Sequence, residues 1–247
     1  MNLLKRIKRK FYGIIRPQRV MKSSEAYDLW ASSYDDQPDN LIVYLDEQVF
    51  TGMINKVDVK GKTVLDFGCG TGRHWKKVFE KEPGRLVGYD VSKEMLSKLA
   101  AKYPGAETYL ATNTALKELS DSSCDLLISS LVIGHIDDLG KTFFEWNRVL
   151  KNGGNILITD FHPDALKSGS NRSFCYNDQV VIVKNYIHSL DELKDLSGKL
   201  NWELINLIER KIDAGVKRFY EKGDAMQVYK ESFDSPILYG CHFRKPG

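Results

Sequence analysis

The chain has 247 residues, which is enough for one α/β domain with an added lid and too few for two full-sized catalytic domains. Its 42% apolar and 28% charged residues allow a sizeable core and exclude global disorder. The formal net charge is +3, but eight bases and no acid precede Glu25, so the remainder carries about −5 (3 minus 8), which argues against nucleic acid or another polyanion as the substrate.

Residues 1–22 combine these bases with apolar residues at roughly helical spacing, interrupted at Gly13 and Pro17. The pattern is typical of an amphipathic helix that rests on anionic lipid, and it fits equally a solvated or core-capping helix or a frayed tail. We therefore distinguish a basic amphipathic segment, 1–22, from a single domain, 23–247. Peripheral membrane contact through residues 1–22 and the oligomeric state both stay open.

The four cysteines are widely spaced and form no CxxC pair, which favours reduced thiols in a cytoplasm. No apolar run approaches the roughly 18 residues of a membrane-spanning helix, and the N-terminus lacks the apolar stretch of a secretory signal. We therefore expect a cytoplasmic protein.

Residues 24–58 are predicted to be helical with a break at Pro38, and short apolar runs then alternate with helical stretches. Strands are expected at 62–67, 85–89, 107–111, 125–131 and 155–161, the last after a turn at 152–154, and helices at 73–81, 92–102 and 139–150. This alternation predicts a parallel sheet with helices on both faces.

The order changes after the fifth strand. Residues 163–198 combine a polar loop, the apolar run 180–183 and a helix with the capping signature Ser189 to Glu192, which we interpret as an inserted lid. Strands at 202–208 and 237–243, with a helical segment at 214–230 between them, can close the sheet in antiparallel fashion. The prediction is a Rossmann-like, doubly wound α/β fold: a mostly parallel seven-stranded sheet with helices on both faces, N-terminal helices and a lid after strand five.

A glycine-rich loop follows the first strand, with Gly68, Gly70 and Gly72 spaced two apart. Glycine lets the backbone turn tightly and approach a ligand closely, although a lone loop of this kind can be only a turn. Asp90 closes the second strand, 18 residues past Gly72, where a doubly wound fold uses a carboxylate to accept hydrogen bonds from ribose hydroxyls. Capping of the helix near Ser92 is the alternative role for Asp90, and the two can coexist.

These segments resemble the class I S-adenosylmethionine-dependent methyltransferases, in particular the small-molecule group that includes the ubiquinone- and biotin-pathway enzymes. The family writes its loop acid-x-Gly-x-Gly-x-Gly, and Asp66 with the three glycines fills every place. Residues 27–35 and 144–154 resemble further elements of the family. The resemblance implies S-adenosylmethionine as the cofactor, with Asp66 near its amino group.

The resemblance also assigns residues to the cofactor. Tyr34 is implied to cover it, and the family's usual acid after the third strand is replaced by Asn113, whose amide oxygen can still accept a bond from adenine. The register is uncertain by one residue, which leaves Thr112 and Thr114 as alternatives. The expected cofactor residues are Tyr34, Asp66, Gly68, Cys69, Gly70, Gly72, Asp90, Val91, Met95, Asn113, Thr114 and Ser130.

A sulfonium methyl group is already activated, so the protein must mainly orient the acceptor, with a base only if the acceptor is protonated. Two histidines follow strands four and five, His135 and His162, and we prefer His162 as the base. A cofactor-flanking or loop-packing role is the favoured interpretation of His135, and a turn before Pro163 explains His162 equally well. The five histidines show no metal-ligand spacing, so no metal is expected.

Polar and aromatic side chains of the lid and the N-terminal element suit a substrate site, although packing also explains them. They are Tyr27, Arg172, Tyr176, Tyr186 and His188. The predicted function is methyl transfer to a small-molecule or lipid-like acceptor, with oxygen favoured. The alternatives are a nicotinamide-dependent oxidoreductase, disfavoured because the glycines miss the Gly-x-Gly-x-x-Gly register, and a non-catalytic protein that binds S-adenosylmethionine.

Overall fold

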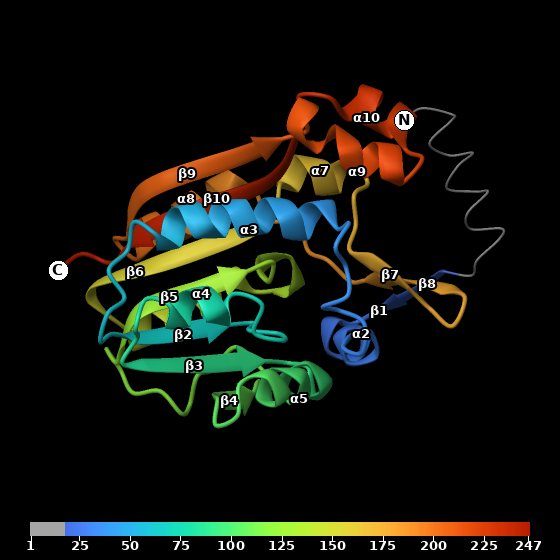
Figure 1. Ribbon diagram of the computed structural model, residues 1–247. Coiled ribbons are helices and arrows are strands. Elements are labelled where there is room, and N and C mark those ends of the chain that lie inside the picture. Colours follow the sequence, from blue (N-terminus) through green and yellow to red (C-terminus); the bar gives the residue numbers. More distant parts are fainter. Residues whose placement is uncertain (1–17) are drawn as a thin grey trace.

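The computed structural model describes residues 18–247, and its main element is a seven-stranded sheet in the order β4-β3-β2-β5-β6-β10-β9 (Figure 1). Strands β2 to β6 run parallel, and β10 pairs in antiparallel fashion with both β6 and β9. The predicted Rossmann-like fold is confirmed, including its antiparallel closure. The strands are β2 (Thr63–Phe67), β3 (Arg85–Asp90), β4 (Glu107–Leu110), β5 (Cys124–Ser130), β6 (Leu150–Phe161), β9 (Glu203–Lys211) and β10 (Pro236–Arg244).

Both faces of the sheet are buried, because neighbouring residues of a strand point to opposite sides and are apolar on each. Val64 and Leu126 belong to one core, whereas the adjacent Leu65 and Leu127 belong to the other. Helices α3 (Leu41–Ile54), α4 (Trp75–Phe79) and α5 (Lys93–Lys102) contribute to the first core, and α6 (Leu139–Val149) and α8 (Leu190–Lys199) to the second. This two-sided burial is why the strands read as continuous apolar runs.

Two segments differ clearly from the sequence prediction. Strand β6 begins at Leu150 rather than after a turn at 152–154. The pairing of β6 with β5 is irregular between Leu150 and Asn155, and Gly153, with φ of 75°, lies within this irregularity. The helical segment expected at 214–230 is divided into η2 (Ala214–Val216), α9 (Lys217–Lys222) and α10 (Met226–Ser232).

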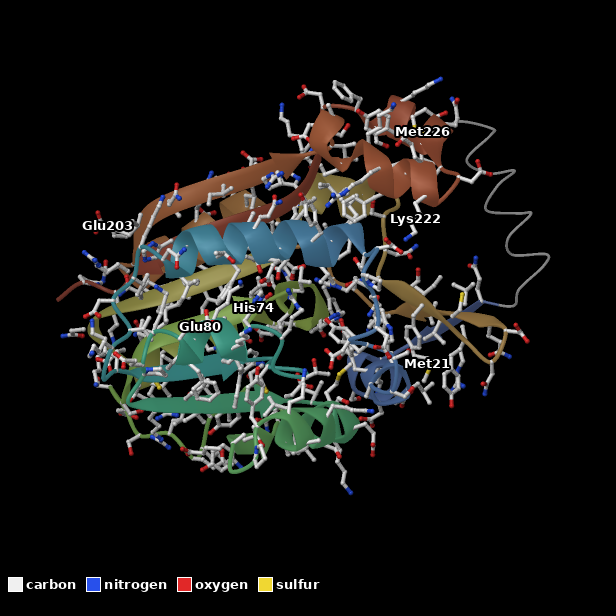
Figure 2. The ribbon with its side chains drawn as sticks, in the orientation of Figure 1. Met21, His74, Glu80, Glu203, Lys222 and Met226 are labelled. Carbon is white, nitrogen blue, oxygen red and sulfur yellow. The ribbon has the colours of Figure 1, made fainter. Side chains whose placement is uncertain are left out.

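A second, smaller sheet stands beyond the carboxyl ends of the parallel strands (Figure 1). It consists of β1 (Gln18–Met21), β8 (Gln179–Val183) and β7 (Ser173–Tyr176), and it packs on α2 (Ser23–Trp30) through Val181, Val183 and a stack of Trp30 on Phe174 with ring centroids 4.5 Å apart. We call these four elements the cap. Figure 2 labels Met21, where β1 ends beside α2.

The cap differs from the lid expected at 163–198. Helix α8 packs on the main sheet through Leu193, which is fully buried, and short α7 (Pro163–Lys167) lies against β10, whereas the N-terminal strand β1 joins the hairpin through parallel pairing with β8. The predicted cap of α8 is present, since Ser189 accepts the backbone N–H of Glu192. The helical spacing of residues 1–17 lies outside the described residues. Within 18–247, no helix is long and apolar enough to cross a membrane.

Candidate functional site

The glycine loop leaves β2 through backbone conformations that favour glycine, with φ of 79° at Gly68, 53° at Gly70 and 73° at Gly72. Gly68 is also required for space, because a Cβ there would lie 2.2 Å from Cγ2 of Val132, a residue after β5. The loop therefore lies close against the tip of β5. This is the point where the strand order reverses and where open α/β sheets bind ligands.

Asp90 ends β3 and faces this loop. Its Oδ2 accepts the backbone N–H of Gly70 at 2.8 Å, and its Oδ1 accepts that of Ser92 at 2.8 Å. Burial raises the pKa of Asp90 to about 6. Each carboxylate oxygen keeps a further lone pair, so the group can hold the loop and still accept two hydroxyl hydrogen bonds.

A cavity of about 350 Å³ opens between these tips, α2 and the segment after β5. Most of the residues expected at the cofactor site line it, and His135 and Tyr27 line it with them. The predicted residues that meet here are Tyr27, Tyr34, Gly68, Gly70, Asp90, Val91, Met95, Asn113, Thr114, Ser130 and His135. Asn113 also accepts the N–H of Ala115 at 2.8 Å, so part of its capacity as an acceptor is used locally.

A second cavity of about 480 Å³ adjoins the first and shares His135 and Val91 with it. Tyr186 lines this second space, together with Lys22 and Lys184. Of the residues expected to contact substrate, Tyr27 therefore lines the first cavity and Tyr186 the second.

Three expected cofactor residues support the loop from behind rather than line the cavities. Asp66 accepts the indole N–H of Trp75 at 2.8 Å, and burial raises its pKa to about 6. The Cys69 side chain packs under Gly88, and Gly72 lies against Leu99 of α5.

His162, which we preferred as the base, lies outside the lining of the two cavities described above. It caps α7 by accepting the N–H of Asp164, and its Nε2 lies 2.9 Å from the Glu209 carboxylate on the edge strand β9. The turn role weighed in the sequence analysis accounts for these contacts.

Two further lid residues, His188 and Tyr176, are likewise absent from the lining of these two cavities. His188 bonds the carbonyl of Ile136 at 2.8 Å and lies 3.2 Å from the Glu192 carboxylate. Tyr176, at the end of β7, is 38% exposed.

His135 is held in one tautomer by its neighbours. Its Nδ1 lies 3.2 Å from the carbonyl oxygen of Lys184, which can only accept, so Nδ1 carries the proton. Nε2 therefore accepts from the hydroxyl of Tyr27, 2.9 Å away. Burial, and then the guanidinium of Arg172, hold the pKa of His135 well below its usual value, so the ring is a neutral base near pH 7.

A buried carboxylate missed by the sequence analysis lies next to Ser130. Asp46 on α3 accepts hydrogen bonds from Arg73 at 2.6 Å, His74 at 2.9 Å and Ser130 at 3.0 Å, and from the hydroxyl of Thr159. Burial works to raise the pKa of Asp46, but Arg73 and His74 lower it overall. Figure 2 labels His74 beneath α3.

A sequence signal for this carboxylate existed. Asp46 shares helical spacing with Val49, Phe50 and Met53, all buried, so it is a lone acid on an apolar stripe. A carboxylate in such a position needs partners from elsewhere in the chain.

Comparison with known proteins gives a consistent result. Residues 65–158 match the family described as methyltransferase domain. The chain is 36% identical over 110 residues to malonyl-acyl-carrier-protein O-methyltransferase of Hamiltonella defensa, covering 44% of this chain and 42% of that protein. It is 36% identical over 115 residues to phosphoethanolamine N-methyltransferase 1 of Arabidopsis thaliana, covering 44% and 23%. The chain thus spans less than half the length of these relatives.

Solved structures agree in fold. A putative methyltransferase of Haloferax volcanii, in complex with the activator Trm112, superposes with a TM-score of 0.68 at 18% identity, covering 91% of this chain and 97% of that one. An S-adenosylmethionine-dependent methyltransferase from Mesorhizobium loti gives 0.61 at 18% identity, covering 79% and 96%. Family match and fold together confirm the recognition made from the glycine loop.

Proposed function

We propose that this chain, which carries a class I methyltransferase domain, transfers the methyl group of S-adenosylmethionine to a small-molecule or lipid-like acceptor. One observation supports this most strongly: the Asp90 carboxylate at the tip of β3 bonds the glycine loop at the tip of β2, and both line the same cavity. Asp90 would accept the ribose hydroxyls, Val91 and Met95 would flank the adenine, and Gly68 and Asp66 would hold the methionine part.

The bound cofactor supplies an activated methyl group on a sulfonium sulfur. Tyr34, Ser130 and Val132 also line the cavity and would orient the acceptor toward that methyl group. The enclosing side chains exclude water, which limits loss of the methyl group to solvent.

His135 is the base that the geometry favours over His162. If the acceptor carries a hydroxyl, its proton passes to the oxygen of Tyr27 while Tyr27 gives its own proton to Nε2 of His135. Burial raises the pKa of Tyr27, which disfavours a free phenolate and couples the two transfers. The acceptor oxygen gains the methyl group as the sulfur becomes a neutral thioether.

We favour oxygen as the acceptor atom. The names of the relatives cover both chemistries, an O-methyltransferase and an N-methyltransferase. A set of hydroxyl, carboxyl and amine acceptors, assayed with labelled S-adenosylmethionine, distinguishes them. Label on an amine alone would overturn the preference for oxygen.

Thermal unfolding with S-adenosylhomocysteine and with NAD separates this function from a nicotinamide-dependent oxidoreductase, because a ligand that binds only the folded state raises its stability. We expect S-adenosylhomocysteine alone to raise the midpoint temperature. A protein that binds the cofactor without turnover would show that shift but no labelled product.

We also propose a cytoplasmic location, no nucleic-acid partner, and peripheral contact of residues 1–22 with anionic membranes. The buried free thiols of Cys69, Cys124 and Cys241 support a reducing compartment such as the cytoplasm. The positive charge of residues 1–22 supports the membrane contact. Sedimentation of the full chain with phosphatidylserine vesicles tests the contact, and its persistence at high salt would argue against an electrostatic origin.

A further inference from the structure

The short segment that carries His135 is held from three sides. The carboxylate Oδ2 of Asp160, on β6, accepts the backbone N–H of Gly134 at 2.8 Å. The backbone N–H of Tyr186 donates to the carbonyl of Gly134 at 2.7 Å, and the carbonyl of Lys184 accepts from His135 Nδ1. Two of the three contacts come from residues 184–186, which follow the cap strand β8 directly.

Arg172, just before β7, connects this segment to the cap. Its guanidinium donates to Oδ1 of Asp160 and, at 2.8 Å, to the side-chain oxygen of Asn185. The Arg172 and Asp160 side chains are 4% and 3% exposed, so the ion pair is buried at both ends. One oxygen of Asp160 thus binds the cap, and the other binds the backbone beside His135.

The contact depends on a glycine. A Cβ on Gly134 would lie 2.8 Å from Nη1 of Arg172 and 3.2 Å from Oδ1 of Asn185. A side chain at this position would therefore push the end of the guanidinium away from the loop.

We propose that Arg172 and Asp160 are positioning residues, through which the docked cap sets the orientation and the tautomer of His135. The proposal rests on the proposed function, in which His135 Nε2 accepts a proton by way of Tyr27. It assigns Arg172 a different role from the direct substrate contact expected from the sequence. A buried ion pair is by itself weak evidence for a gain in stability, which leaves room for such a specific role.

The charge of Arg172 acts on the pKa of His135, which a role in packing alone would not do. Tyr27 on α2 and the backbone carbonyl of Lys184 bond the His135 ring, and the charge of Arg172 acts on it. Asp160 on β6 bonds the neighbouring Gly134. Arg172 lowers the pKa of His135, so replacing it with a neutral residue should raise that pKa. Because the neutral ring is the base, the acid limb of the pH profile would then move to higher pH.

The test compares Arg172→Gln, Arg172→Lys and Gly134→Ala with the control Gly198→Ala, whose new Cβ meets nothing within 4 Å. Nitrogen-15 NMR of the histidine rings gives the tautomer and pKa of His135 whether or not turnover occurs. In the wild type we expect a neutral ring protonated on Nδ1. In Arg172→Gln we expect mixed tautomers and a raised pKa of His135.

Kinetics complete the experiment. We expect Arg172→Gln and Gly134→Ala to lower kcat by about 10- to 100-fold while S-adenosylhomocysteine affinity changes little. Arg172→Lys, which keeps the charge, should keep the acid limb near its wild-type position. An unchanged tautomer and pKa in Arg172→Gln would overturn the positioning role even if Gly134→Ala fails to fold. A wild type that does not bind S-adenosylhomocysteine would instead contradict the proposed function.

Discussion

Asp90 and Gly70 join the ends of two neighbouring strands: Oδ2 of Asp90, at the tip of β3, accepts the backbone N–H of Gly70, in the loop after β2, at 2.8 Å. One carboxylate therefore shapes the loop and faces the cavity that the loop borders. This double use makes the two strand tips a single binding element.

Asp90→Ala should weaken S-adenosylhomocysteine binding by about 10²- to 10⁴-fold, because it removes two hydrogen bonds to a charged group that each contribute roughly 1.5–3 kcal/mol. Isothermal titration calorimetry measures the loss. Asp191→Ala, which removes an exposed acid on α8, is the control and should bind like the wild type. Equal affinity in all three proteins would remove the ribose assignment.

Cofactor affinity should fall as the pH drops through about 6, since burial raises the pKa of Asp90 to about 6 and the ionised form is the better acceptor. Below that pH, the loss should approach about tenfold per pH unit. The raised pKa of Asp90 also stabilises the fold at pH values below the usual pKa of 3.8. This contribution to the free energy of unfolding is lost as the pH rises through about 6. Calorimetry between pH 5 and 8 checks the trend, and a flat profile would contradict it.

Gly68→Ala and Gly70→Ala form a matched pair. Both residues have positive φ, which should cost about 1–2 kcal/mol, but only at Gly68 would the new Cβ also meet the stiff side chain of Val132 at 2.2 Å. That overlap should add about 1–3 kcal/mol. In urea unfolding, the free energy of unfolding of Gly68→Ala should therefore be well below that of Gly70→Ala. Equal values would contradict the close approach of the loop to β5.

His135→Ala should lower kcat by about 10²- to 10⁴-fold, the range for loss of a general base, with a much smaller effect on cofactor affinity. His162→Ala should instead cost about 1 kcal/mol of stability, because it removes the cap of α7 and the contact with Glu209. Steady-state kinetics with thermal unfolding separate the two. The reverse pattern, with kcat lost only in His162→Ala, would restore the base preferred from sequence.

Asp46→Asn should destabilise the fold by about 3–5 kcal/mol, since it leaves the Arg73 charge without its buried partner. The lowered pKa of Asp46 stabilises the fold at pH values above the usual pKa of the group. This contribution to the free energy of unfolding is lost as the pH falls below that usual pKa. Wild type should therefore lose stability on acidification more steeply than Asp46→Asn. Guanidinium unfolding at pH 6 and pH 3, on either side of the usual pKa of 3.8, measures the loss in both proteins, and equal losses would contradict the assignment.

The fold was predictable because its evidence is local. Each strand is a short apolar run, and each glycine of the loop is needed for its own backbone conformation, so β2, its loop and Asp90 could be identified without knowledge of distant contacts. The irregular start of β6 was not predictable, since whether Gly153 makes a turn or a bulge depends on pairing with β5.

The cap and the base were harder to predict because their evidence is long-range. Strand β1 is four residues of no clear periodicity, and it exists through pairing of Met21 with Val183. The spacing of His135 and His162 does not reveal their contacts. The His135 ring bonds Tyr27, 108 residues away, and the His162 ring bonds Glu209. The same holds for Asp46, whose partner Thr159 is 113 residues distant.

A crystal structure of the protein with S-adenosylhomocysteine tests the central claim most directly. The account predicts the nucleoside in the 350 Å³ cavity, with both ribose hydroxyls within hydrogen-bond distance of Asp90 and the amino-acid part along Gly68. A cavity closed by side chains at saturating ligand, or a nucleoside bound away from Asp90, would contradict it.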